Sequence, residues 1–115
     1  MVEHTSEISI KVTLDSEKIP SNITWSASDQ GPNSEAEAKA FLLSIFDKDH
    51  KDTLKIDLWT KEMQVVEMDR LFFNTLKGLA DSYMRATGNN KLAGAMQQFA
   101  LYFGEQVEIL TKEKE

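Results

Sequence analysis

The sequence predicts an α+β fold whose elements follow the order ββαβαα, with a three-stranded antiparallel or mixed sheet and helices on one face. Near the N-terminus, apolar and polar residues alternate, which is typical of a strand with one buried face. In the second half, apolar residues recur every three to four positions over long segments, which is typical of amphipathic helices. The 115 residues match the length of one ordinary domain. We therefore expect one domain over residues 1–115, with 1–6 and 111–115 mobile.

The first two elements are predicted to be strands that pair antiparallel. From Glu7 to Leu14, every second residue is isoleucine, valine or leucine, so one face of this strand is apolar. A polar loop containing Pro20 follows, and the alternation resumes at residues 23–26. Short alternating runs on both sides of such a loop indicate a β-hairpin.

The third element is predicted to be a helix over residues 36–46. Ser34, with Glu37 three positions later, matches the capping-box pattern that starts many helices. The apolar residues of this segment share one broad helical face. They are Ala38, Phe41, Leu42, Ile45 and Phe46. The polar run 47–52 is expected to end the helix.

Residues 53–60 are predicted to form the third strand. Leu54, Ile56 and Leu58 form its inward set, whereas Lys55, Asp57 and Trp59 face outward. A tryptophan among the polar residues of an open sheet face is unusual enough to be a candidate contact residue.

Two long helices, over residues 65–86 and 91–110, are predicted to complete the chain. Gly88 suits the left-handed position that ends a helix. Asn89 or Asn90 suits the cap of the next one. Because the connection is short, we expect the two helices to pack as an antiparallel pair.

The apolar faces of these two helices differ in width. In the last helix, the apolar residues form one narrow stripe, which contains Leu92, Met96, Phe99, Phe103, Val107 and Leu110. In the preceding helix, apolar residues that include Met68, Phe73 and Met84 spread over roughly 220° of the helical wheel. Such a wide arc indicates either a helix sandwiched between the sheet and the last helix, or a helix that contributes to a subunit interface.

Composition and charge exclude several classes of function. The net charge is −6, from 19 acidic and 13 basic residues, and no basic stripe is present, so we expect no nucleic-acid partner. The longest apolar runs are too short to span a bilayer, so we expect no direct membrane insertion. The chain has no cysteine, and residues 1–20 contain no signal-like apolar region, so we expect a cytoplasmic protein.

The sequence offers no catalytic, cofactor-binding or metal site. The two histidines, His4 and His50, lie in the N-terminal segment and in a polar run. A calcium loop that started at Asp47 would need an oxygen ligand, glycine and glutamate at its fifth, sixth and twelfth positions. The chain has Lys51, Asp52 and Leu58 there. Its five glycines are scattered, so no phosphate-binding loop is present.

Two surfaces are the candidates for binding a partner. One is the open sheet face around Trp59, with Lys55 and Asp57 beside it and Lys11 and Thr13 of the first strand as expected neighbours. The other is the wide apolar arc of the long helix, represented by Met68, Phe73 and Met84.

Several stretches resemble the gliding motility-associated GldC family of Bacteroidetes. They are Ala38–Asp47, Leu54–Met63, Thr5–Ile8, Ile23–Trp25, Phe72-Phe73 and Ala80-Asp81. The most specific piece is Asp57–Lys61, which lies within the stretch Leu54–Met63. Where family members often have proline, this chain has Gln64, which would fix the start of the long helix less sharply. The resemblance implies a cytoplasmic protein of surface gliding, with no reaction and no cofactor.

Three functional hypotheses follow. The first is a structural or adaptor protein that binds protein partners of the gliding machinery and forms a homodimer. The second is a chaperone-like protein that holds a gliding or secretion component. The third and weakest is a small-ligand binder or enzyme, which requires a deep pocket with convergent polar groups.

Overall fold

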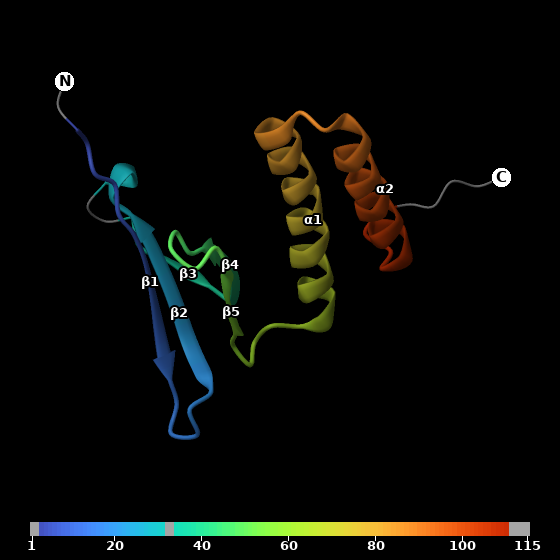
Figure 1. Ribbon diagram of the computed structural model, residues 1–115. Coiled ribbons are helices and arrows are strands. Elements are labelled where there is room, and N and C mark those ends of the chain that lie inside the picture. The colour runs from blue at the N-terminus through green and yellow to red at the C-terminus, as the bar shows by residue number, and fades with distance from the viewer. Residues whose placement is uncertain (1–2, 32–33, 111–115) are drawn as a thin grey trace. The chain divides into compact units, whose positions relative to one another are not determined.

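The computed structural model describes residues 3–31 and 34–110. The chain divides into two compact units, the first ending at Met63 and the second starting at Gln64. All strands belong to the first unit, and both long helices belong to the second (Figure 1). The mobility expected for residues 1–2 and 111–115 concerns positions outside the described residues, and the single-domain expectation stays a prediction.

The structure confirms the α+β class and the two C-terminal helices, but the predicted order ββαβαα is wrong in its middle. Two strands replace the first predicted helix, and the strands form two antiparallel sheets instead of one three-stranded sheet. The elements are β1 (Ile8–Leu14), β2 (Pro20–Ala27), a 3-10 turn η1 (Ser28–Gln30), β3 (Ala36–Ala38), β4 (Ala40–Phe46), β5 (Thr53–Trp59), α1 (Val65–Thr87) and α2 (Asn90–Gln106).

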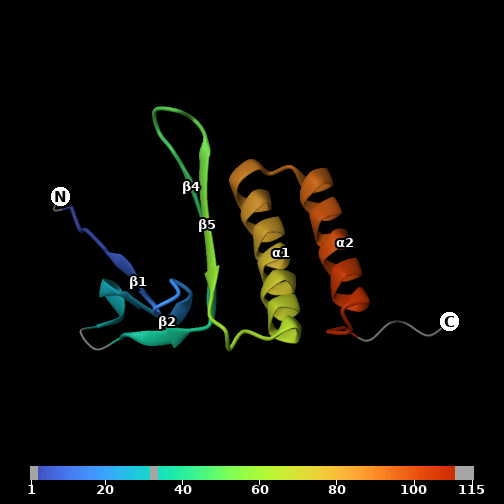
Figure 2. The same ribbon diagram turned by 90° about the horizontal axis from the view of Figure 1, so that it is seen from below.

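The segment 36–46 belongs to both sheets. Its first part, β3, pairs with β2, which in turn pairs with β1. Its second part, β4, pairs with β5 from Ala40 opposite Trp59 to Phe46 opposite Thr53. A single residue, Lys39, separates the two parts, and its carbonyl accepts a 2.8 Å hydrogen bond from the N–H of Thr60. Figure 2 shows the β4–β5 hairpin turned away from β1 and β2.

The helix predicted over residues 36–46 is a strand because its apolar run finds a partner strand. A short apolar run fits a buried strand as well as a helical face. The Ser34 hydroxyl, expected to cap a helix, instead donates to the carbonyl of Ala27 at 3.2 Å. Residues 53–59 supply the complementary strand, so pairing outweighs the local helical pattern.

Asp47 stabilises the turn that connects β4 to β5 and so allows these two strands to pair as a hairpin. Its N–H donates to the carbonyl of Asp52 at 2.8 Å, and its carbonyl accepts from the N–H of Lys51 at 3.0 Å. Its carboxylate accepts from the N–H of His50 at 2.7 Å, and its Oδ2 lies 2.8 Å from the His50 ring Nδ1. Mainly the backbone N–H of His50, and then its ring, lower the pKa of Asp47. The polar run that was expected to end a helix is therefore a turn stabilised by an Asp side chain.

The helix boundaries follow local signals. Gln64 is the residue before α1, and its N–H donates to Oε1 of Glu67 at 3.0 Å, so the helix starts sharply without proline. Gly88 ends α1 with φ 70°, and its N–H donates to the carbonyl of Met84 at 2.8 Å. The side chain of Asn89 caps α2 by accepting from the N–H of Leu92 at 3.1 Å. The predicted Gly88 stop and Asn89 cap are thus confirmed.

The two helices lie side by side and run antiparallel (Figures 1 and 2). Small residues form most of their buried seam. The seam consists of Phe73 and Ala80 of α1 with Ala93, Ala100 and Gly104 of α2. A Cβ atom added to Gly104 would lie 2.6 Å from Cε1 of Phe73. The absence of a side chain at Gly104 therefore makes room for the Phe73 ring.

The C-terminal end of α2 folds back over the same glycine. The carbonyl of Gly104 accepts from the N–H groups of Ile109 and Leu110 at 2.9 and 3.0 Å. Glu108 has φ 64°, a left-handed conformation that reverses the chain. The helix therefore ends at Gln106 and not at residue 110 as predicted.

Replacing Gly104 with alanine tests the seam. We expect Gly104→Ala to destabilise the protein by about 1–3 kcal/mol, because the new methyl group overlaps the Phe73 ring. Gly94 of the same helix is the matched control, because nothing lies within 4 Å of an added Cβ. Gly94→Ala should raise stability by about 0.5–1 kcal/mol. Urea unfolding followed by circular dichroism measures both, and equal effects would contradict the packing described for Phe73.

The Asp47 turn predicts how stability depends on pH. A carboxyl whose pKa is lowered by folding contributes stability above its unfolded pKa of about 3.9, and that contribution is lost as pH falls through the folded pKa. We expect wild-type stability to drop below about pH 4 and Asp47→Asn to drop less over the same range. Urea unfolding at a series of pH values from neutral to acidic measures the two slopes. Parallel slopes would show that Asp47 does not stabilise the turn through its charge.

Candidate functional site

The hairpin β4–β5 presents Trp59 on one of its faces, which we call the Trp59 surface. Cross-strand pairing places Trp59 opposite Ala40, Asp57 opposite Leu42 and Lys55 opposite Ser44. Trp59 is 51% exposed, and Lys55 and Asp57 beside it form an ion pair. At the far end of the same face, Phe46 is 67% exposed.

The structure brings together only part of the residue set predicted around Trp59. Lys55, Asp57 and Trp59 share one face of β5. Lys11 and Thr13 belong to β1, a strand of the other sheet, and Lys11 pairs with Glu35 at 3.2 Å. The expected neighbourhood assumed a single sheet, which the strand pairing contradicts. Phe46 was not identified as part of this surface because residues 36–46 were predicted to be helical.

The opposite face of the same hairpin is entirely apolar. Every cross-strand pair on it joins two large apolar side chains. These pairs are Phe41 with Leu58, Leu43 with Ile56, and Ile45 with Leu54. Because alternate residues of a strand point to opposite faces, the hairpin separates a wholly apolar face from the mixed Trp59 surface.

Thr60 and Lys61, next to Trp59, have structural roles in the first unit. Thr60 is 5% exposed, its N–H donates to the carbonyl of Lys39, and its carbonyl accepts from the N–H of Met63 at 3.1 Å. Lys61 forms an ion pair with Asp15 at 3.2 Å. The hydroxyl of Thr60 has no hydrogen-bond partner among the described residues. It lies beside a polar cavity of about 280 Å³ where β2 departs from the segment 36–46.

The second predicted surface, on α1, is divided by the seam. Phe73 is buried in the seam, so it is not available to a partner. Met84 lies on the same side of the helical wheel as Phe73, whereas Met68 lies roughly 140° from Phe73 at 100° per residue. The three residues predicted as one contact arc therefore do not form one exposed surface.

The helical pair nevertheless exposes a different apolar set, which we call the helical apolar face. Phe72 and Leu79 of α1, and Leu92 and Phe99 of α2, are each between 41% and 52% exposed. On each helical wheel they lie about 100° from that helix's seam residues. Because the helices are antiparallel, these offsets place all four on the same side of the pair. Leu92 and Phe99 of the narrow stripe predicted for α2 thus belong to this face, whereas Leu110 of the same stripe lies against Gly104 of the seam.

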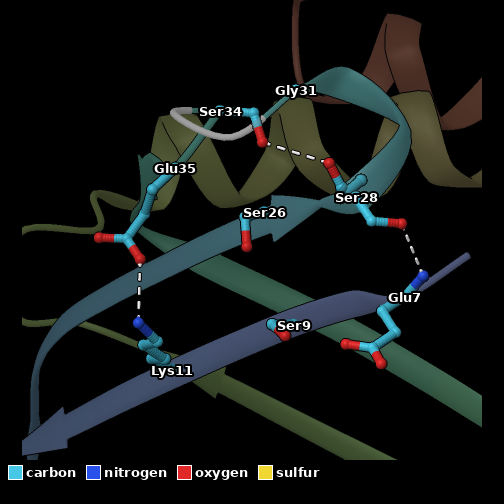
Figure 3. Close-up of a pocket in the computed structure, with 9 residues that line it drawn as sticks. Glu7, Ser9, Lys11, Ser26, Ser28, Gly31, Ser34 and Glu35 are labelled. Carbon is cyan, nitrogen blue, oxygen red and sulfur yellow. Dashed lines mark hydrogen bonds and ion pairs between the residues drawn. The ribbon is translucent and has the colours of Figure 1, made fainter.

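A polar pocket with a volume of about 580 Å³ lies on the first sheet (Figure 3). Its polar lining includes four serines, Glu7, Lys11 and Glu35. The Ser28 hydroxyl accepts from the N–H of Glu7 at 2.9 Å, and Lys11 pairs with Glu35. A serine nucleophile needs a base within reach, and the described lining contains no histidine.

Three carboxyl groups of the first unit have lowered pKa values, and each accepts hydrogen bonds from other residues of this unit. The pKa of Asp15 is lowered first by the N–H of Ile19, and that of Asp29 first by the hydroxyl of Ser6. Asp47 closes the hairpin turn. A lowered pKa makes a carboxylate a weaker base, so these groups suit structural hydrogen bonds better than proton abstraction.

No group of three or more His, Cys, Asp or Glu residues in the described chain could hold a metal ion. None of the described helices is long and apolar enough to cross a membrane.

Comparisons with known proteins gave one finding. A family model described as "GldC-like: Gliding motility-associated protein GldC-like" matches residues 20–109. This span covers β2 through α2, and therefore includes the Trp59 surface and both helices. Searches of curated proteins and of solved structures gave no match to the chain.

Proposed function

The chain belongs to the GldC-like family of gliding motility-associated proteins, and on that premise we propose that it is a non-enzymatic adaptor of the gliding machinery. In this proposal it acts in the cytoplasm by binding other proteins. The observation that carries the proposal is the half-exposed Trp59 on the mixed face of the β4–β5 hairpin. Tryptophan is among the residues most enriched at the energetic centres of protein interfaces.

The size of Trp59 makes it a strong anchor. An aromatic side chain buries roughly 150–250 Å² when it is fully covered. About half of the Trp59 side chain is still exposed, so covering it would contribute about 2–3 kcal/mol at the usual value per unit of apolar area. A contribution of this size is typical of a single interface hot spot.

The charges beside Trp59 suit a protein partner. Lys55 and Asp57 neutralise one another, so a partner can cover Trp59 without burying an unpaired charge. Phe46 supplies a second exposed aromatic side chain on the same face. Aromatic anchors next to paired charges resemble an interface centre and its rim.

Truncating Trp59 tests this proposal. We expect Trp59→Ala to weaken capture of gliding-machinery proteins at least tenfold, or by about 1.4 kcal/mol or more, and to reduce gliding. Ile8→Ala is the matched control, because Ile8 is also a large exposed apolar residue but belongs to the other sheet. Circular dichroism confirms that each variant folds. Unchanged capture and gliding in Trp59→Ala would remove this surface from the proposal.

The helical apolar face favours a second candidate function, a chaperone-like protein that holds a gliding or secretion component. Four large side chains on one side of a helix pair form a surface of the kind that binds unfolded apolar segments. This function does not require Trp59.

The two functions predict different results with an unfolded client. If the protein holds clients, it should delay their aggregation in a light-scattering assay, and the double variant Leu79→Gln, Phe99→Gln should lose this effect because both side chains lie on the helical apolar face. Trp59→Ala should retain it. Absence of any delay at equimolar protein would rule out the chaperone-like function and leave the adaptor proposal in place.

A further inference from the structure

The outer edge of β4 is open in the described structure. The sheet that contains β4 has two strands, β4 and β5, and no third strand of the described chain pairs with β4. An isolated two-stranded hairpin is marginally stable in water. The seven residues of β4, AFLLSIF, contain no charge, no proline and no glycine. This strand is therefore both in need of a neighbour and free of the features that prevent pairing.

The hydrogen bonds at the two ends of the hairpin show which backbone groups are free. Lys39 bonds to Thr60, and Asp47 bonds to Asp52. Backbone groups of successive strand residues point to alternate edges, so the odd-numbered residues between these pairs bond to β5. The even-numbered residues direct their N–H and C=O groups to the open edge. They are Ala40, Leu42, Ser44 and Phe46.

The other strand edges of the first unit carry features that oppose pairing. The edge strand β1 contains Lys11 and has an irregular register between Thr13 and Leu14. The strand β5 carries the charged pair Lys55 and Asp57. The strand β3 has only three residues. Charges, irregular register and short length are the usual protections of an edge, and β4 has none of them.

We propose that β4 pairs antiparallel with β4 of a second copy of this chain, with Leu43 on the two-fold axis. In this register Ala40 lies opposite Phe46 of the partner subunit, and Leu42 lies opposite the partner subunit's Ser44. All four open-edge residues of each copy then bond to open-edge residues of the other, giving up to about eight backbone hydrogen bonds. If the two-fold axis passed through Leu42 or Ser44 instead of Leu43, fewer residues of the two β4 strands would pair.

The side chains of β4 are self-complementary in this register. The smallest residue, Ala40, faces the partner subunit's Phe46, and β4 contains no charged residue that could face a like charge across the axis. Leu43 meets the partner's Leu43, and Phe41 meets the partner subunit's Ile45, so the apolar face of the hairpin continues across the axis. A shift by one residue would place apolar residues on the mixed face, which disfavours it.

A chain without cysteine allows a direct test of the register. Leu43→Cys places the only two thiols of the dimer opposite one another, at a Cα separation of about 4.5 Å, which permits a disulfide. Ile45→Cys is the matched control on the same face, because its two copies would be offset by four residues, or about 14 Å along the strands. After mild oxidation, we expect Leu43→Cys to run at twice the 13.0 kDa mass of the chain and Ile45→Cys to remain a monomer. No crosslink at residue 43, or equal crosslinking at both residues, would overturn the proposal.

Proline at Ser44 tests the same edge without a crosslink. Ser44 directs its N–H outward, so Ser44→Pro removes a bond between copies and no bond to β5. We expect the wild type to sediment as a dimer and Ser44→Pro as a 13.0 kDa monomer with its circular dichroism retained. Where the proline variant does not fold, Ser44→Glu replaces it, because glutamate faces Lys55 within the hairpin and adds like charges near the axis. A monomeric wild type, or a dimer that a folded Ser44 variant leaves intact, would overturn the proposal.

The inference does not rest on the proposed function. Trp59 lies on β5 and takes no part in the pairing, so Trp59→Ala should leave the dimer intact. If the wild type is a dimer but Trp59→Ala captures partners as well as the wild type does, the proposed function fails and the dimer stands. If the wild type is a monomer that captures partners through Trp59, the dimer fails and the proposed function stands.

Discussion

The hydrogen bonds between β4 and β5 run in one register from the Lys39–Thr60 pair to the Asp47–Asp52 pair. Because a strand alternates in both its side chains and its backbone groups, this register decides two things together. It places Trp59 with Lys55 and Asp57 on one face and six apolar residues on the other, and it decides which backbone groups of β4 stay free. A register shifted by one residue would place Lys55 and Asp57 on the same face as Phe41, Leu43 and Ile45. The candidate surface and the open edge thus depend on one set of bonds.

In the second unit, the seam of small residues between α1 and α2 determines which apolar side chains are exposed. Ala93, Ala100 and Gly104 let the α2 backbone approach α1, and the Phe73 ring occupies the space that Gly104 leaves. Phe99 lies about 100° from the small residues of α2 on the helical wheel and is half exposed. The helical apolar face is a consequence of this close approach.

Features set by local chemistry could be predicted from the sequence, whereas features set by distant pairing could not. The Gly88 stop and the Asn89 cap depend on neighbours within a few residues, and both are found. Residues 36–46 were predicted to be helical because their apolar spacing fits a helical face, and only pairing with 53–59 makes them a strand. The exposure of Trp59 was predicted from alternation within one strand, but its assignment to a face with Lys11 required knowing the sheet. Likewise, hydrophobicity favours Phe99 for the seam, although the geometry selects Ala100.

Self-pairing of β4 would also change the Trp59 surface. Trp59 lies opposite Ala40 on the hairpin, and in the proposed register Ala40 lies opposite the partner subunit's Phe46. One cross-strand row would then contain Trp59, Ala40 and Phe46 of the partner subunit on the same mixed face. Neighbouring strands lie about 4.8 Å apart, so the two aromatic side chains would be about two strand spacings from one another. The two-fold axis repeats the row, so a dimer would present two such sites on one sheet face. A partner that carries two matching segments would then bind more tightly than to a single chain, because the second contact is intramolecular.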